Sequence, residues 1–145
     1  MVEDSKKNAV SSLKKICLNV AEAIFYFYGW LWTLRPRKAK SMKDVLDLFY
    51  LDFLRVNRKD IEVVKLDDRE LITRCKNPCP ILKLSILLNV DTKVACRVVS
   101  EPVCKYVLRK LNSQLVFERN YSHIRPYSES CEERISLKAE NRTIC

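Results

Sequence analysis

The first part of the chain repeats apolar residues every three or four positions, and this spacing predicts one long helix over residues 5–34. Its apolar stripe consists of Ile16, Val20, Ile24, Phe27 and Leu31. From Ala23 onward aromatic side chains occupy the other faces as well, so the helix needs cover on every side. We expect its outer face to pack on a second subunit, in preference to a membrane span or a helix in a membrane interface.

A basic linker, residues 35–40, separates this helix from the next one. Pro36 interrupts the helical pattern, and Ser41 with Asp44 has the spacing of a capping box. The apolar positions that follow predict a second helix over residues 42–56.

Two later regions have the composition and period of strands. Residues 61–66 and 70–74 are short β-rich runs around two aspartates, which indicates a hairpin. Residues 115–123 alternate with a period of two, and residues 131–137 alternate again after a turn. The sequence therefore predicts two hairpins.

Two short helices are expected between these hairpins. Pro80 follows Cys79 and opens a helix that runs to about residue 89. We expect Cys96 on a short connection, followed by a helix over residues 101–112.

These elements predict an α+β fold with two N-terminal helices, an antiparallel sheet made of two hairpins, and two short helices between them. We expect a single domain over residues 1–145, with a cysteine-containing core at 41–138 and a frayed tail at 139–145. A chain of this length can bury a core without disulfides.

The formal net charge of +9 raises the question of an acidic partner. The basic residues are spread along the chain, so we do not favour nucleic acid as the partner. The seven cysteines are an odd number, and the first residues lack the layout of a secretory signal. We therefore expect a cytoplasmic protein, in which closely spaced cysteines hold metal more often than they form disulfides.

Five of the seven cysteines and the single histidine lie between residues 75 and 131. The candidate metal ligands are Cys75, Cys79, Cys96, His123 and Cys131. Zinc would accept His123, whereas a [4Fe-4S] cluster would prefer the four cysteines of this set. The sequence leaves open whether Cys75 or Cys104 belongs to the site.

Other roles compete for the same residues. A free cysteine is often a small buried hydrophobe, and this is how we interpret Cys17, while Cys145 is a tail residue. A nucleophilic cysteine assisted by His123 is a further alternative, with Cys79 or Cys131 as the thiolate. The single glycine, Gly29, excludes a phosphate-binding glycine loop.

The order of elements resembles the 4-vinyl-reductase-type domain and the related aminothiazoline-carboxylate-hydrolase-like proteins. The resemblance is carried by Cys79-Pro80 before a helix, Cys96 after it, and Cys131-Glu132-Glu133-Arg134-Ile135 in the last hairpin. It implies a dimer formed through the N-terminal helix and a small apolar or heteroaromatic ligand next to a metal. It places Cys96, His123 and Cys131 at ligand positions, and it implies no hydrolase activity.

Our leading hypothesis is a metal-thiolate domain, with zinc or an iron-sulfur cluster, that binds a small molecule or responds to redox conditions. The first alternative is a hydrolase-like enzyme that uses a cysteine or a metal-bound water. The second is a basic adaptor for nucleic acid or a membrane surface.

Overall fold

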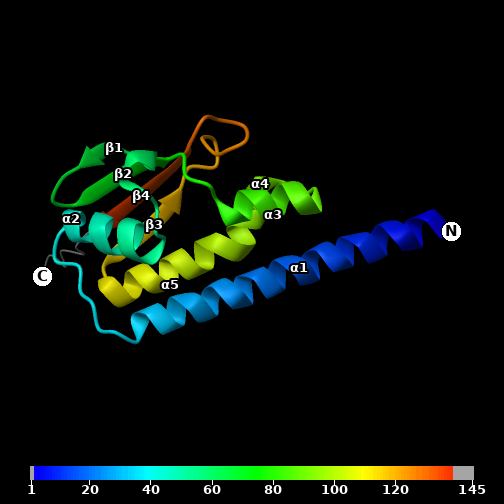
Figure 1. The fold of residues 1–145 in the computed structure, drawn as a ribbon, viewed down its shortest axis with the longest axis horizontal. Coiled ribbons are helices and arrows are strands. Elements are labelled where there is room, and N and C mark those ends of the chain that lie inside the picture. The colour runs from blue at the N-terminus through cyan, green and yellow to red at the C-terminus, as the bar shows by residue number, and fades with distance from the viewer. Residues whose placement is uncertain (1, 139–145) are drawn as a thin grey trace, which may run out of the picture.

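The structure is a computed structural model that describes residues 2–138, with side chains described from residue 12 onward. The predicted frayed tail, including Cys145, lies outside the described residues. The fold is α+β, as the sequence predicts, with helices packed against an antiparallel sheet (Figure 1).

The sheet has four strands in the order β1-β2-β4-β3. The strands are β1 (Ile61–Leu66), β2 (Glu70–Cys75), β3 (Leu115–Arg119) and β4 (Cys131–Leu137). All neighbouring pairs are antiparallel, and the two hairpins meet along β2 and β4. Both predicted hairpins are confirmed. Their junction sets Cys75, the last residue of β2, directly opposite Cys131, the first residue of β4.

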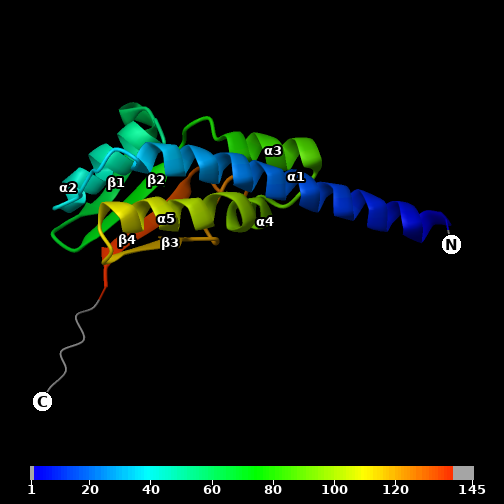
Figure 2. The ribbon, with the colours of Figure 1, turned by 90° about the horizontal axis from the view of Figure 1, so that it is seen from below.

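The long helix α1 (Val2–Thr33) runs beside α5 (Glu101–Leu111), and its N-terminal part extends beyond the rest of the molecule (Figures 1 and 2). Gly29 allows this close packing, because an added Cβ would lie 3.1 Å from Val103 and 3.2 Å from Val107. The helix is apolar on two faces. The side chains of its inner face that pack on the cores are Leu18, Ala21, Phe25, Tyr28 and Trp32.

The apolar stripe read from the sequence is the outer face of α1. Its five residues, Ile16, Val20, Ile24, Phe27 and Leu31, are each 45–66% exposed. Leu13 and Leu34 extend the same exposed face at either end. Over the described residues, none of the helices is long and apolar enough to cross a membrane.

The second helix begins as predicted and ends earlier. Ser41 caps α2 (Met42–Val45), and the capping box with Asp44 is present. The helix continues as η1 (Leu46–Phe53), a π-helix whose hydrogen bonds span five residues. It stops before Val56 because Arg55 adopts a left-handed conformation with φ of 52°.

The expected connection at Cys96 is wrong, because Cys96 lies inside a continuous helical run. This run comprises α4 (Thr92–Ala95), η3 (Cys96–Ser100) and α5. Asp91 caps its start by accepting a hydrogen bond from the Lys93 backbone N–H. Pro102 therefore falls inside a helix, and the π-helical turn η3 directly precedes it, where a helix interior must adapt to the missing N–H.

The prediction of a strand to His123 is also wrong, since β3 ends at Arg119. Asn120 ends the strand by accepting two backbone hydrogen bonds, one from Ser122 to its side chain and one from His123 to its carbonyl oxygen. Asparagine competes for backbone donors in this way at turns. The loop 120–130 then leads to β4.

The main core lies between the inner face of the sheet, η1 and α5. Phe49, Val103 and Ile135 are fully enclosed there. A smaller cluster joins α1, α3 (Pro80–Leu88), α4 and η3 through Leu18, Ala95, Val99 and their neighbours. The region between the two clusters holds the candidate site.

Candidate functional site

A cavity of about 710 Å³ lies between α1, η1, η3 and the adjoining ends of β2 and β4. Ligand-binding pockets fall in the range of roughly 300–1,000 Å³. Its walls are mainly apolar, and those supplied by α1 and η1 are Ala21, Ile24, Phe25, Tyr28, Tyr50 and Phe53. Both π-helical segments contribute to the lining, and such segments are frequent at functional sites.

Five cysteines from different elements line this cavity. Cys75 ends β2 and Cys131 begins β4, directly opposite each other. Cys79 is the N-cap of α3, Cys96 opens η3, and Cys104 lies in α5. The fold therefore gathers all four cysteines of the predicted ligand set, with Cys104 added.

His123 is not among the residues that line the cavity. Its Nε2 atom lies 2.8 Å from the Ser130 hydroxyl, within the loop that precedes Cys131. Cys17 on α1 is also outside the lining and half-buried. In the part of the chain that the structure describes, no three histidine, cysteine or acidic side chains are already arranged to hold a metal ion.

Three of the lining thiols are enclosed by the core. Burial raises the pKa of Cys75 to about 12 and that of Cys104 to about 12, because the charged thiolate loses hydration. Burial likewise raises the pKa of Cys96 to about 11. Without a metal, these three groups are neutral thiols near pH 7, and they line the cavity as weakly polar surface.

Cys131 has a different environment, because a guanidinium group contacts its sulfur. Its Sγ accepts hydrogen bonds from the backbone N–H of Arg125 at 3.5 Å and from Nε of Arg125 at 3.4 Å. Arg125 Nη1 also donates to the carbonyl oxygen of Asn77 at 2.6 Å. This arginine therefore connects the loop after β2 with the loop before β4, where two walls of the cavity meet.

A chain of buried polar groups crosses the inner end of the cavity. Thr73 donates to the Tyr50 hydroxyl at 2.9 Å, and Tyr50 donates to Oε2 of Glu133 at 2.8 Å. Arg119 Nη2 donates to Oε1 of Glu133 at 2.6 Å and to the Ser100 hydroxyl at 3.2 Å. Burial, followed by the charge of Glu133, holds the pKa of Tyr50 well above its usual value.

One nitrogen of this chain has no partner. Nη1 of Arg119 is buried and has no hydrogen-bond acceptor among the described residues. The Arg119 side chain is only 6% exposed. Burial opposes its charge, but Glu133 more than offsets this and holds the pKa of Arg119 well above its usual value. The guanidinium is therefore charged and keeps two N–H bonds unused.

The charges that line the cavity are mostly positive. Arg55, Arg119 and Arg125 contribute three guanidinium groups, and Glu133 contributes one carboxylate, which gives a net charge of +2. An anion that enters the cavity would reduce this imbalance.

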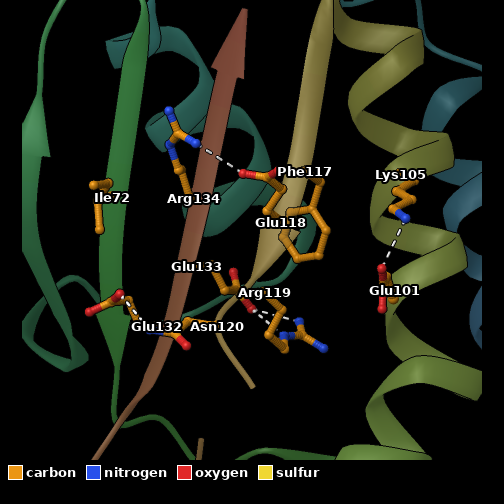
Figure 3. Close-up of a pocket in the computed structure, with 10 residues that line it drawn as sticks. All are labelled: Ile72, Glu101, Lys105, Phe117, Glu118, Arg119, Asn120, Glu132, Glu133 and Arg134. Atoms are coloured by element: carbon orange, nitrogen blue, oxygen red, sulfur yellow. Dashed lines mark hydrogen bonds and ion pairs between the residues drawn. The ribbon is translucent and has the colours of Figure 1, made fainter. Parts of the chain in front are cut away.

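A second hollow, of about 530 Å³, lies over β3, β4 and the start of α5 (Figure 3). Its lining is charged, and the charges pair with one another. Arg134 contacts Glu118 at 3.1 Å, and Lys105 contacts Glu101 at 2.9 Å. Arg119 lines both hollows, so its ion pair with Glu133 lies where the charged hollow and the apolar cavity adjoin.

Arg119 and Glu133 are not among the site residues that the sequence predicts, although the pattern of the strands contains a signal for both. Arg119 alternates in phase with Leu115 and Phe117, and Glu133 alternates in phase with Ile135. In a strand this phase places both charged residues on the inward face. Charged residues are rarely buried unless they are paired, so two of them at inward positions on adjacent strands predict an internal ion pair.

No family model matches this chain, and no curated protein or solved structure is significantly similar to it.

Proposed function

We propose that this chain is a binding domain for a small carboxylic acid with an apolar body. The ligand would occupy the cavity between α1, η1, η3 and the sheet, with its carboxylate at Arg119. The observation that carries this proposal is the buried Nη1 atom of Arg119, which has no acceptor among the described residues and belongs to a side chain that lines the cavity.

The cost of an unpaired nitrogen is what favours a ligand. A buried donor without an acceptor costs about 1–3 kcal/mol, and a charged donor costs more. An acceptor atom supplied by a ligand would recover this energy. A planar carboxylate matches the fork of a guanidinium group better than a single acceptor does.

The walls support the apolar part of the ligand. Phe25, Tyr28 and Phe53 present aromatic rings at the cavity, and Phe53 stacks on Phe25 with 5.8 Å between ring centroids. Aromatic side chains offer large, stiff contact areas to an apolar or heteroaromatic ring. The net charge of +2 in the lining favours an anion over a cation or a neutral molecule.

The proposal is tested by comparing acids with their methyl esters. We expect aromatic and medium-chain aliphatic carboxylates to bind with one site per chain in calorimetric titrations, and their esters to bind at least tenfold more weakly. Arg119→Lys should lower the binding affinity for the acids and leave the affinity for the esters unchanged. Arg134→Lys is the matched control, because Arg134 is a paired guanidinium on the same sheet. Equal affinity for acids and esters would contradict the proposal.

A metal-thiolate centre is the second candidate function, favoured by the five cysteines that line the same cavity. We propose Cys75, Cys79, Cys96 and Cys131 as the ligands of zinc or of a [4Fe-4S] cluster. Four thiolates around zinc carry a net charge of −2, and this would balance the +2 of the lining. These cysteines would then be deprotonated on binding the metal.

Metal analysis of protein purified without oxygen tests this second candidate. We expect about one zinc ion per chain, or four irons with a visible absorption band, and loss of the metal in Cys79→Ser. Cys17→Ser is the control, since Cys17 lies outside the cavity lining. The same metal content in both variants would contradict the ligand set.

We further propose that a second copy of the chain covers the outer face of α1, in a reducing cytoplasm where the thiols stay free. From Leu13 to Leu34 the apolar stripe runs about 32 Å along the helix, at 1.5 Å per residue. The exposed apolar residues follow one another at intervals of three or four, which allows two such helices to interdigitate. A monomer rarely leaves so long an apolar face open.

Light scattering on a sizing column tests the dimer. Val20→Glu should give a monomer, because it places a charge in the middle of the stripe. Asn19→Glu is the matched control, an exposed neighbour off the stripe, and it should stay dimeric. A monomeric wild type, or one that instead binds phospholipid vesicles through this face, would contradict the proposal.

A further inference from the structure

Cys75 and Cys131 differ from the other lining thiols in how the backbone places them. They are directly opposite in the antiparallel pair of β2 and β4, so their side chains point to the same face of the sheet. The positions of Cys79, Cys96 and Cys104 relative to them depend on the packing of helices instead. The register alone therefore holds two thiols side by side at the cavity wall.

This register is compatible with a covalent bond between the two sulfurs. Residues directly opposite in an antiparallel pair have Cα atoms about 4.5 or 5.5 Å apart. Disulfides join residues whose Cα atoms are about 4.4–6.8 Å apart. Cys75 is the last residue of its strand and Cys131 is the first of its own, so each adjoins a loop that can adjust.

The surroundings of the two sulfurs assign them different roles. Cys131 is half-buried, and its Sγ accepts two hydrogen bonds from Arg125. Of the two sulfurs, that of Cys131 is therefore the more accessible to a peroxide. Cys75 is only 6% exposed and is shielded from direct attack. It faces Cys131 and can react with it.

We propose that Cys75 and Cys131 form a peroxide-sensitive dithiol that closes into a disulfide between β2 and β4 at the wall of the cavity. The inference concerns the wall of the proposed ligand site, and it rests on the proposed function only for its effect on the ligand.

The reaction has two steps. The Cys131 sulfur attacks one oxygen of hydrogen peroxide, the O–O bond breaks, and the thiol proton goes to the departing hydroxide, so the products are a sulfenic acid and water. The Cys75 thiol then attacks the Cys131 sulfur, the S–O bond breaks, and the oxygen leaves as water with the thiol proton. Over both steps, the two thiols lose two protons and two electrons, and these reduce one hydrogen peroxide to two water molecules. A thiol reductant reverses the result.

Closure changes the cavity in two ways. It ties the ends of β2 and β4 together, and it converts the Cys131 sulfur, which accepts hydrogen bonds from Arg125, into a disulfide sulfur. Arg125 also holds the carbonyl oxygen of Asn77, so oxidation acts on the connection between two walls of the ligand site. We expect the oxidised protein to bind carboxylates with an affinity at least threefold different from that of the reduced protein.

Tryptic peptide mapping tests the disulfide directly. Reduced protein of known metal content is treated with hydrogen peroxide, its free thiols are alkylated, and the digest is analysed by mass spectrometry. Trypsin separates the lining cysteines onto different peptides: 75–76, 77–83, 94–97, 98–105 and 120–134. We expect peptide 75–76 linked to peptide 120–134 in the oxidised sample, and both peptides alkylated after reduction.

The variants and the outcomes separate this inference from the proposed function. Cys131→Ser should abolish the linked peptide, and Cys79→Ser should retain it. A link between any other pair, or higher oxidation of Cys131 with Cys75 still free, would overturn the inference. The wild-type digest decides this even if a variant fails to fold. Carboxylate binding is measured on the reduced protein in parallel, so loss of the linked peptide with intact binding refutes the dithiol alone.

Discussion

The side chain of Arg119 lines both hollows of this molecule, but the arginines of the two hollows differ in exposure and in the number of carboxylates they contact. In the charged hollow Arg134 lies on the sheet surface with its side chain 50% exposed, and it contacts Glu118 (Figure 3). It also contacts Glu70. In the apolar cavity Arg119 is 6% exposed, and Glu133 is the one carboxylate among the described residues with which it forms an ion pair. The exposed guanidinium contacts two carboxylates, whereas the buried one contacts a single carboxylate and has one nitrogen without an acceptor among the described residues.

The two arginines therefore differ in burial and in how fully their nitrogens are paired. Exposed ion pairs contribute little to stability, so those of Arg134 in the charged hollow add little to the stability of the fold. In the buried pair, Glu133 more than offsets the cost of burying the Arg119 charge, but Nη1 of Arg119 still has no acceptor among the described residues. The unpaired nitrogen of this buried charge is what supports the proposed binding role of the apolar cavity.

The largest expected effect is on stability, from breaking the buried pair. Arg119→Met leaves the Glu133 carboxylate without its guanidinium and should reduce the free energy of unfolding by about 3–5 kcal/mol. Glu133→Leu added to Arg119→Met should recover part of the loss, because no unpaired charge remains. Urea unfolding of both variants measures this. If Arg119→Met lowered the free energy of unfolding by less than about 1 kcal/mol, the Arg119–Glu133 pair would contribute no more than an exposed ion pair does.

The next effect concerns ligand affinity. Arg119→Lys keeps a positive charge beside Glu133 and removes the guanidinium fork. A hydrogen bond to a charged group contributes about 1.5–3 kcal/mol, so carboxylate affinity should fall by roughly 10- to 150-fold. Arg134→Lys should change it less than twofold. Competition of unlabelled acids with a fluorescent carboxylate gives both values, and equal losses would remove the distinction between the two hollows.

Alkaline pH provides a third test, because it acts on the buried thiols of the cavity. Cys104 has a pKa of about 12 when folded and an ordinary value near 9.0 when unfolded. Between these values the unfolded chain releases a proton that the folded chain keeps, so stability is complete below pH 9 and falls as the pH rises. One such thiol contributes a slope of about 1.4 kcal/mol per pH unit.

Cys104→Ala should therefore flatten the decline of the unfolding free energy between pH 9 and 11 by about that slope. Cys17→Ala, a half-buried thiol outside the cavity lining, serves as the control and should leave the slope unchanged. An identical pH dependence in the two variants would show that Cys104 is not enclosed as described.

The smallest effect is expected in the charged hollow. Glu118→Gln removes one partner of Arg134, whose guanidinium still contacts Glu70. The side chain of Glu118 is 57% exposed, so the loss should be no more than about 0.5 kcal/mol. Thermal unfolding at low and high salt measures it, and a loss above 2 kcal/mol would mean that this hollow also depends on its ion pairs.

Local signals predicted much of the fold. The capping box at Ser41, the hairpin over residues 61–75 and the helix opened by Pro80 are decided by neighbouring residues, and all three are confirmed. Cys96 was misplaced because Pro102 resembles a helix start, whereas packing against α1 keeps the helix continuous through it. Strand β3 was drawn too long because its alternation continues past Asn120, where side-chain hydrogen bonds end the ladder.

In the candidate site too, features set by local sequence were predicted and features set by non-local contacts were not. The cysteines stood out because they are rare and closely spaced, and five of them line one cavity. Arg119 was missed because its burial depends on which residue it meets across the sheet. The partner is Glu133, directly opposite Arg119 in the register of β3 and β4. That pairing is non-local, and a spacing analysis within one segment does not detect it.

The most direct test of the binding site is nuclear magnetic resonance of the arginine side chains during titration with a carboxylate. The guanidinium resonances of Arg119 should shift as the acid binds, with saturation at one equivalent, and those of Arg134 should stay unchanged. Carboxylate binding that leaves Arg119 unmoved, or that shifts Arg134 instead, would contradict the assignment of the buried guanidinium as the anchor of the ligand.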